Sequence, residues 1–397
     1  MIFIRGAKLL HFLDIHNNFC EKVVKIWPVE GFCHLFYIPL QAFSRIAHPL
    51  YAPKLKKRNT SDLNKSMINR ELIRIKAVQL TYAYFQNASN KIDSAEKELV
   101  FSLSKSYHLY KVLLLLIVAV TRMARKRYEV AKARTDREGG TRPSGKFAFN
   151  KFAEQLESNL TLKEYVEEAG DIWAEKQEFV KSLYLQIEQS EAFRDFMASD
   201  DDSYEAHREV WRKIYRQFIQ NNEDVSDNLE EVSLYWNDDK DVVDTFVLKT
   251  IKRFDPANGE AQELLQEYDD EQDRDYAIRL FRAAVMNADL YQHYMTEASR
   301  NWDFSRLAYM DVVIMQLAIA EMMTFPNIPI SVTINEYVDL AKLYSTPRSG
   351  GYINGMLDGI ARHLIKVGEL NKVMPERPVY KKPAEKADKN KPENTEK

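Results

Sequence analysis

Two stretches of the chain combine basic side chains with features that suit binding to a phosphate backbone. In the first, Arg70, Arg74 and Lys76 are followed shortly by Tyr82. Cations can bind phosphates and tyrosine rings can stack on unpaired bases, so this combination is typical of contact with single-stranded RNA. The second stretch, from Arg122 to Lys146, contains nine basic residues. Judged by charge alone, each basic stretch is explained more simply as a solvated face of a helix than as an RNA-binding surface.

Other residue patterns that could support chemistry are incomplete. Residues 140–146 (GTRPSGK) match most of a P-loop, but Phe147 stands where a magnesium-binding hydroxyl is needed and no buried strand precedes the loop. The acidic clusters at 200–202 and 269–271 fall in helix connections, where carboxylates favour the positive end of the next helix. The cysteines and histidines between His11 and His34 match no common zinc module. The sequence therefore predicts a protein that is not an enzyme, with no catalytic residue, metal or cofactor.

Composition favours a helical protein. The 397 residues are 45% hydrophobic and 29% charged, which is ordinary for a soluble globular chain, and wholesale disorder is excluded. Only 12 Gly and 13 Pro are present, so the tight turns of a sandwich, a barrel or a doubly wound sheet are scarce. The two cysteines indicate a reducing compartment, and the expected location is the cytoplasm. The net charge of −3 does not exclude RNA as a partner, because local patches set the field at a groove.

The longest apolar run lies at residues 112–120 (VLLLLIVAV). Crossing a bilayer takes about 20 apolar residues, so the run is too short for a membrane span. It predicts a buried core helix instead. The hydrophobic residues near the N-terminus are interrupted by Lys8, His11 and Asp14, and they are not typical of a secretory signal.

The chain divides into five segments by composition and pattern. Residues 1–66 are rich in aromatics and carry ten basic against four acidic side chains, without a sustained helical period. We hypothesise that translation starts at Met67, which native peptides from residues 1–58 would refute. Residues 67–90 predict one amphipathic helix, and residues 91–260 predict charged helices with a flexible loop from Arg134 to Lys146. Residues 261–367 carry the strongest helical pattern, including one helix over 273–300 and an apolar one over 304–324. Residues 368–397 have the composition of a disordered tail.

Several motifs in this chain resemble a known family. Residues 332–342 (VTINEYVDLAK) and 352–358 (YINGMLD) resemble the AINEAVELAK and FVNGVLD elements of the NusB family of transcription antitermination factors. Residues 306–322 are similar to the central helix of that family, and residues 74–82 (RIKAVQLTY) resemble its opening RxxAxQxLY helix. The resemblance covers residues 67–86 and about 273–367. It implies an all-α, NusB-like bundle of two helical subdomains, into which a helical region at 91–260 is inserted.

The resemblance also implies a function. Family members bind the boxA element of ribosomal RNA operons together with the small-subunit ribosomal protein NusE, and the complex joins RNA polymerase. On this basis we expect phosphate contacts from Arg70, Arg74 and Lys76, base or ribose contacts from Tyr82 and Tyr352, and a partner contact from Asp311. Arg348 stands at a position where family members commonly have an acidic residue. The resemblance therefore suggests that some of the phosphate affinity has moved to Arg348. Residues 134–146 could extend the RNA footprint.

Two alternative functions stay open at this point. One is a protein scaffold in ribosome assembly that no longer binds RNA. The other is an accessory domain related to ribosomal RNA cytosine methyltransferases, although only a short tail follows residue 367. Homodimerisation is also left open. Titration with boxA RNA, with and without the ribosomal partner, separates these functions because only the antitermination factor is expected to show joint, salt-sensitive binding.

Overall fold

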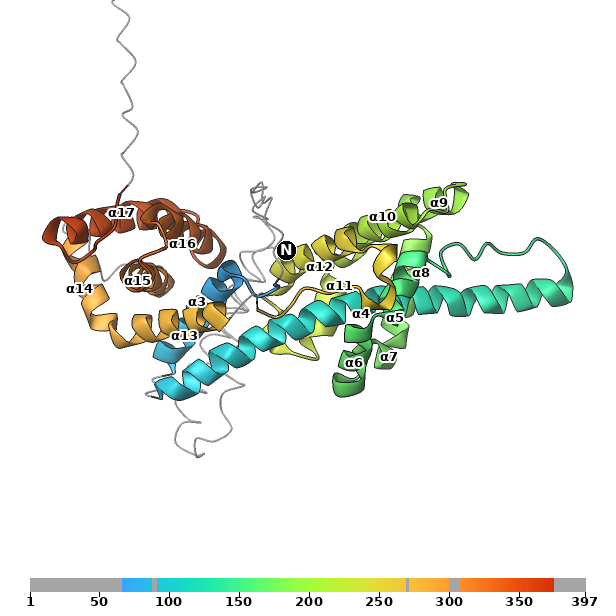
Figure 1. Cartoon of the computed structure of the whole chain (residues 1–397), viewed down its shortest axis with the longest axis horizontal. Coiled ribbons are helices and arrows are strands. Elements are labelled where there is room, and N and C mark those ends of the chain that lie inside the picture. Colours follow the sequence, from blue (N-terminus) through green and yellow to red (C-terminus); the bar gives the residue numbers. More distant parts are fainter. Residues whose placement is uncertain (1–65, 88–90, 269–270, 300–306, 375–397) are drawn as a thin grey trace, which may run out of the picture. The chain divides into compact units, whose positions relative to one another are not determined.

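The computed structural model describes residues 66–87, 91–268, 271–299 and 307–374, which form helices joined by short connections (Figure 1). These residues divide into two units, with the division after Val285. The predicted all-α fold is confirmed: in the described ranges no strand forms, and Ser66 and Gln266 make only an isolated bridge. The predictions for residues 1–65 and 375–397, including the position of the start, lie outside the described residues.

The first unit is organised around α4 (Ile92–Glu138), which runs along its whole length in Figure 1. Residues 112–120 are all buried, which confirms the predicted core helix. By length and composition α4 is the one helix in the described residues that could cross a membrane, but 78% of its apolar window is buried inside the protein. This is the burial expected of a core helix. Helices α3 (Arg70–Gln86), α5 (Lys151–Ser158), α6 (Leu160–Ala169), α7 (Ile172–Glu175), α8 (Gln177–Glu188) and α12 (Lys240–Arg253) pack against α4.

The remaining elements of this unit complete its core. They are α9 (Glu191–Ala198), α10 (Tyr204–Ile214), the π-helical turn η2 (Tyr215–Ile219), α11 (Glu223–Glu230), the 3₁₀ turns η3 (Leu234–Trp236) and η4 (Pro256–Ala261), and α13 (Glu271–Met286). The backbone of Met67 and Ile68 bonds to the carbonyls of Gln266 and Glu267, so the chain just before α3 is held against the segment before α13.

Helix α3 is buried more completely than its sequence pattern predicts. Asn69 caps its first turn by accepting a hydrogen bond from the Leu72 amide at 2.9 Å. The ten residues 72–81 are all buried, including the polar ones. The predicted helix is present, but residues 72–81 leave it no exposed polar face. The helix packs on α4, and Tyr276 of α13 covers the arginine side, as described below.

Asparagines separate consecutive helices at two places in the structure. Asn159 ends α5 and begins α6, and its side-chain oxygen accepts from the Leu162 amide at 3.2 Å. The predicted helix over 273–300 is interrupted at Asn287, between α13 and α14 (Ala288–Ala298). In the opposite sense, α4 continues to Glu138, so the predicted loop from Arg134 to Lys146 begins only at Gly139.

The second unit is a bundle of α14, α15 (Tyr309–Thr324), α16 (Ile330–Tyr344) and α17 (Ser349–Val367). Twelve consecutive residues of α15, from Asp311 to Met322, are buried, as expected of a helix that packs on three neighbours. After α17, Leu370 is buried and the Lys372 ammonium donates to the carbonyls of Phe325 and Ile328 at 2.7 and 2.8 Å. Residues 368–374 are thus not part of a disordered tail as predicted.

Candidate RNA-binding surfaces

Lys76 is part of a buried ion pair. Its ammonium nitrogen lies 2.8 Å from Oδ1 of Asp239, and both side chains are 0% exposed. The other carboxylate oxygen of Asp239 accepts from the Ser106 hydroxyl at 2.5 Å, while Lys76 also donates to the Tyr235 carbonyl at 3.3 Å. The predicted phosphate contact of Lys76 is wrong, because RNA cannot reach this ammonium without unfolding the site. No local signal could have found the partner, which lies 163 residues further along the chain.

Arg70 and Arg74 lie against the ring of Tyr276 in α13. Their guanidinium carbons are 5.2 and 5.9 Å from the ring centroid, which is within the range of cation–π attraction. Arg74 is buried, so its predicted phosphate contact is also wrong in this structure. The Arg70 side chain is 50% exposed and lies 3.8 Å from a carboxylate oxygen of Asp273. Of the three predicted cations of α3, only Arg70 is accessible to a phosphate.

Tyr82 lies near the C-terminal end of α3 and is partly exposed. Its neighbour Tyr84 makes an edge-to-face contact with Phe281 of α13, with ring centroids 6.1 Å apart. Tyr84 therefore contributes to packing. The base or ribose contact of Tyr82 stays a prediction.

Asp311 is buried at the start of α15 and accepts hydrogen bonds from two hydroxyls. The Ser345 hydroxyl lies 2.5 Å from one carboxylate oxygen and the Ser349 hydroxyl lies 2.9 Å from the other. Ser349 is the first residue of α17, so the carboxylate fixes the connection between α16 and α17. These contacts show a structural role for Asp311 inside the second unit, and its partner contact stays a prediction.

Arg348 and Tyr352 lie at the beginning of α17, close to this cluster. Arg348 is the exposed N-cap residue, so its guanidinium is accessible to a phosphate. Tyr352 is half-buried, and its burial together with the nearby Asp311 charge raises the pKa of its phenol. The hydroxyl oxygen itself is buried, so it is not exposed to a base. Their RNA contacts stay predictions.

Much of the basic run from Arg122 to Lys146 is paired with acidic groups of the first unit. Arg122 lies 2.7 Å from Glu157, and Arg125 lies 3.2 Å from the same carboxylate. These two arginines keep the pKa of the Glu157 carboxyl below its ordinary value, despite the opposing effect of burial. Beyond Arg127, the run leaves the packed body, and residues 129–146 include no buried side chain.

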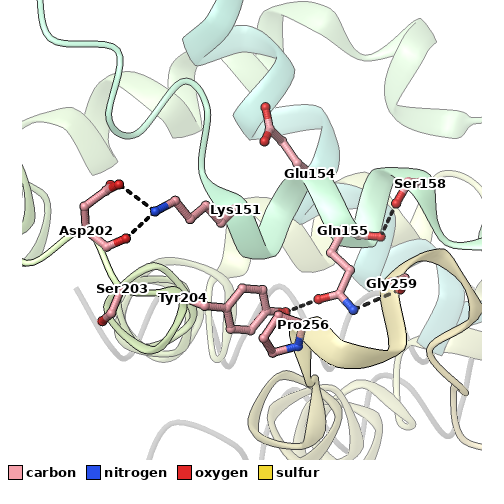
Figure 2. A pocket seen from close by; sticks show the side chains of 9 residues that line it. All are labelled: Lys151, Glu154, Gln155, Ser158, Asp202, Ser203, Tyr204, Pro256 and Gly259. Atoms are coloured by element: carbon pink, nitrogen blue, oxygen red, sulfur yellow. Dashed lines mark hydrogen bonds and ion pairs between the residues drawn. The ribbon is translucent and has the colours of Figure 1, made fainter.

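The described residues also line an open pocket of about 580 Å³ between α5, α10 and η4 (Figure 2). Its polar groups bond mainly to one another. The Tyr204 hydroxyl donates to the Gln155 amide oxygen, and the Gln155 nitrogen donates to the Gly259 carbonyl at 2.9 Å. Lys151 lies 2.5 Å from Asp202, whose pKa is lowered to about 2 by this contact and by His207. These polar side chains already have hydrogen-bond or ion-pair partners within the protein. The pocket is therefore better explained as a polar contact between neighbouring elements than as a reaction site.

Comparison with known proteins places the chain in a family. The NusB family model matches residues 245–362, which extend from α12 to α17. "Transcription antitermination protein NusB" of Salinibacter ruber is 32% identical over 132 residues, or 32% of this chain and 82% of that protein. The proteins of the same name from Dictyoglomus thermophilum and Natranaerobius thermophilus are 41% and 45% identical over 66% and 58% of their own lengths, and over 24% and 20% of this chain. No solved structure matches the chain. The helical bundle and these similarities together show that the chain belongs to the NusB family.

Proposed function

We propose that this protein is an RNA-binding transcription antitermination factor of the cytoplasm. It would bind boxA RNA of ribosomal RNA operons together with NusE and act on elongating RNA polymerase, through binding and without catalysis. The observation that carries the proposal is membership of the NusB family, whose relatives are named for transcription antitermination.

Solvent exposure reduces the number of side chains that can contact RNA. On α3 these are Arg70 and the partly exposed Tyr82, and on α17 they are Arg348 and Tyr352. Because Arg74 and Lys76 are buried, α3 supplies fewer phosphate contacts than its sequence predicts. A partner protein or a further surface of this chain must then provide part of the affinity.

Titration of the full chain with boxA RNA, alone and with NusE, tests the proposal. We expect tighter binding in the presence of NusE, with an affinity that falls as the salt concentration rises. Binding to NusE that is unaffected by RNA, with no RNA binding under any condition, would favour the ribosome-assembly scaffold instead.

Arg70→Ala is expected to weaken RNA binding and to reduce the slope of log affinity against log salt by about 0.7, the value for one phosphate contact on a single strand. Stability should change by no more than about 0.5 kcal/mol, because the side chain is half-exposed. Lys181→Ala on α8, a cation of similar exposure, is the matched control and should leave the slope unchanged. Equal slopes for Arg70→Ala and the parent protein would remove Arg70 from the RNA-binding surface.

A further inference from the structure

The distal end of α4 forms an arm with the loop that follows it. The arm comprises residues 129–145: the last turns of α4 extend past the neighbouring helices, and the chain returns through Gly139 and Gly140 (Figure 1). Both glycines have positive φ angles, 76° and 121°, which suit glycine and allow this reversal. None of the residues of the arm is buried. Packing inside this unit therefore does not account for the length of the helix.

The root of the arm is packed against the first unit. The ammonium of Lys146 donates to the carbonyls of Phe196 and Ser199 at 2.8 and 2.6 Å, and Phe147 is fully buried. Gly145 leaves room for two aromatic rings, since a Cβ there would lie only 3.0 Å from the Phe149 ring and 3.3 Å from the Tyr128 ring. The two rings thus pack closely over the backbone of Gly145.

These rings and two cations form what we term the aromatic–cation patch, composed of Arg125, Tyr128, Lys132 and Phe149. The rings meet edge to face with centroids 5.4 Å apart. Arg125 lies 5.7 Å from the Phe149 centroid and Lys132 lies 5.9 Å from the Tyr128 centroid. Phe149 is 39% exposed. An exposed ring beside cations is the arrangement that binds an unpaired base and its phosphate.

The charge around the patch favours a polyanion. Residues 122–146 contain nine basic and three acidic side chains, whereas residues 151–261 contain 27 acidic and 13 basic ones. The acidic groups that face the patch are Glu129, at 3.9 Å from Lys132, and Glu154 and Glu157, at 3.7 and 3.2 Å from Arg125. The charged pairs that involve the patch and the arm are all partly exposed, so water screens them and a phosphate can compete for the cations.

We propose that the aromatic–cation patch binds single-stranded RNA, with an unpaired base against Phe149 and the adjoining phosphates near the cations of the arm. This inference rests on the proposed RNA-binding function and adds a contact surface outside residues 245–362, the part that matches the family model. It also supplies phosphate contacts that α3 lacks. Single strands fit better than duplexes because only unpaired bases present their faces to a ring.

The chain contains a matched control for this proposal. Phe101, also on α4, is 45% exposed and meets Tyr235 edge to face at 5.4 Å, with the Lys105 ammonium 5.0 Å from its ring. The ring pair thus has nearly the same geometry. Its surroundings differ, because the Tyr235 hydroxyl donates to Glu98 and the chain around Tyr235 is acidic. If exposed rings alone were sufficient, both sites would bind RNA.

The test compares Phe149→Ala, Phe101→Ala and the parent full chain. The probe is a fluorescein-labelled boxA RNA, single-stranded or annealed to its complement, and a second version carries 2-aminopurine to report base stacking. We expect Phe149→Ala to weaken single-strand binding at least about fivefold, the lower end of the loss for one stacked base, and to reduce the quenching of 2-aminopurine. Phe101→Ala and duplex binding should be unaffected.

Three outcomes would overturn the inference. They are parent-like binding by Phe149→Ala, equal losses for Phe149→Ala and Phe101→Ala, and equal losses on single-stranded and duplex RNA. In each of these, binding by the parent chain still supports the proposed function. Absence of RNA binding by the parent, with and without NusE, would instead refute the proposed function itself. Circular dichroism spectra of both variants check that the fold is retained.

Discussion

Lys76→Met is expected to lower the free energy of unfolding of the first unit by about 3–5 kcal/mol, the usual cost of removing one partner of a buried ion pair. The variant leaves the Asp239 carboxylate without its cation at a position that is 0% exposed. The Ser106 hydroxyl, which donates to the same carboxylate, cannot replace a full charge. Urea unfolding followed by circular dichroism measures this change.

The double variant Lys76→Met with Asp239→Leu should recover much of the loss, because an apolar pair of similar volume removes the isolated charge. Lys181→Met serves as the exposed control, for which a change of less than about 0.5 kcal/mol is expected. A similarly small change for Lys76→Met would show that the ion pair does not form in solution. Lys76 would then return as a phosphate contact.

Asp311→Ala is expected to destabilise the second unit by about 2–4 kcal/mol. Hydrogen bonds to a charged group contribute about 1.5–3 kcal/mol each, and this carboxylate accepts two of them in a buried position. The serine hydroxyls can still bond to each other at 3.0 Å, which reduces the loss. The midpoint of thermal unfolding measures the effect.

Asp339→Ala is the matched control for this prediction. Asp339 lies on α16 in the same unit, and its exposed carboxylate pairs with Lys342 three residues away. A contact of this kind contributes at most about 1 kcal/mol. If Asp311→Ala weakened NusE binding without changing the unfolding midpoint, the carboxylate would have to be available to a partner, and the structural role assigned to it would be wrong.

The segment 91–260 is part of the same unit as helix α3, whose sequence motif at 74–82 resembles the opening helix of the family. Lys76 of that helix reaches Asp239, and the Gln79 amide donates to Asp238 at 3.0 Å. On the other side, Arg282 of α13 binds both carboxylate oxygens of Glu96 at 2.6 Å. Because α3 packs on α4 and α13 is bound to it through Glu96, we expect removal of residues 91–260 to destabilise both of these helices as well.

Local pattern was sufficient to predict several features from the sequence. The run at 112–120 is apolar on all sides, so a helix formed by it must be buried on all sides. In the structure these residues lie in α4 and all of them are buried. The motif at 332–342 identified the family without any knowledge of the fold, because it depends on residue identity alone.

The accessibility of each side chain was decided only by the tertiary structure. The spacing of Arg70 and Arg74 places them on one side of a helix, but it does not reveal that Tyr276, about 200 residues away, covers that side. Lys76 and Asp311 have the same chemistry whether exposed or buried, and their partners lie on other helices. A periodic pattern specifies which residues share a face, because helix geometry is local. What packs against that face depends on the path of the whole chain, and this is why the fold was predictable while most of the individual contacts were not.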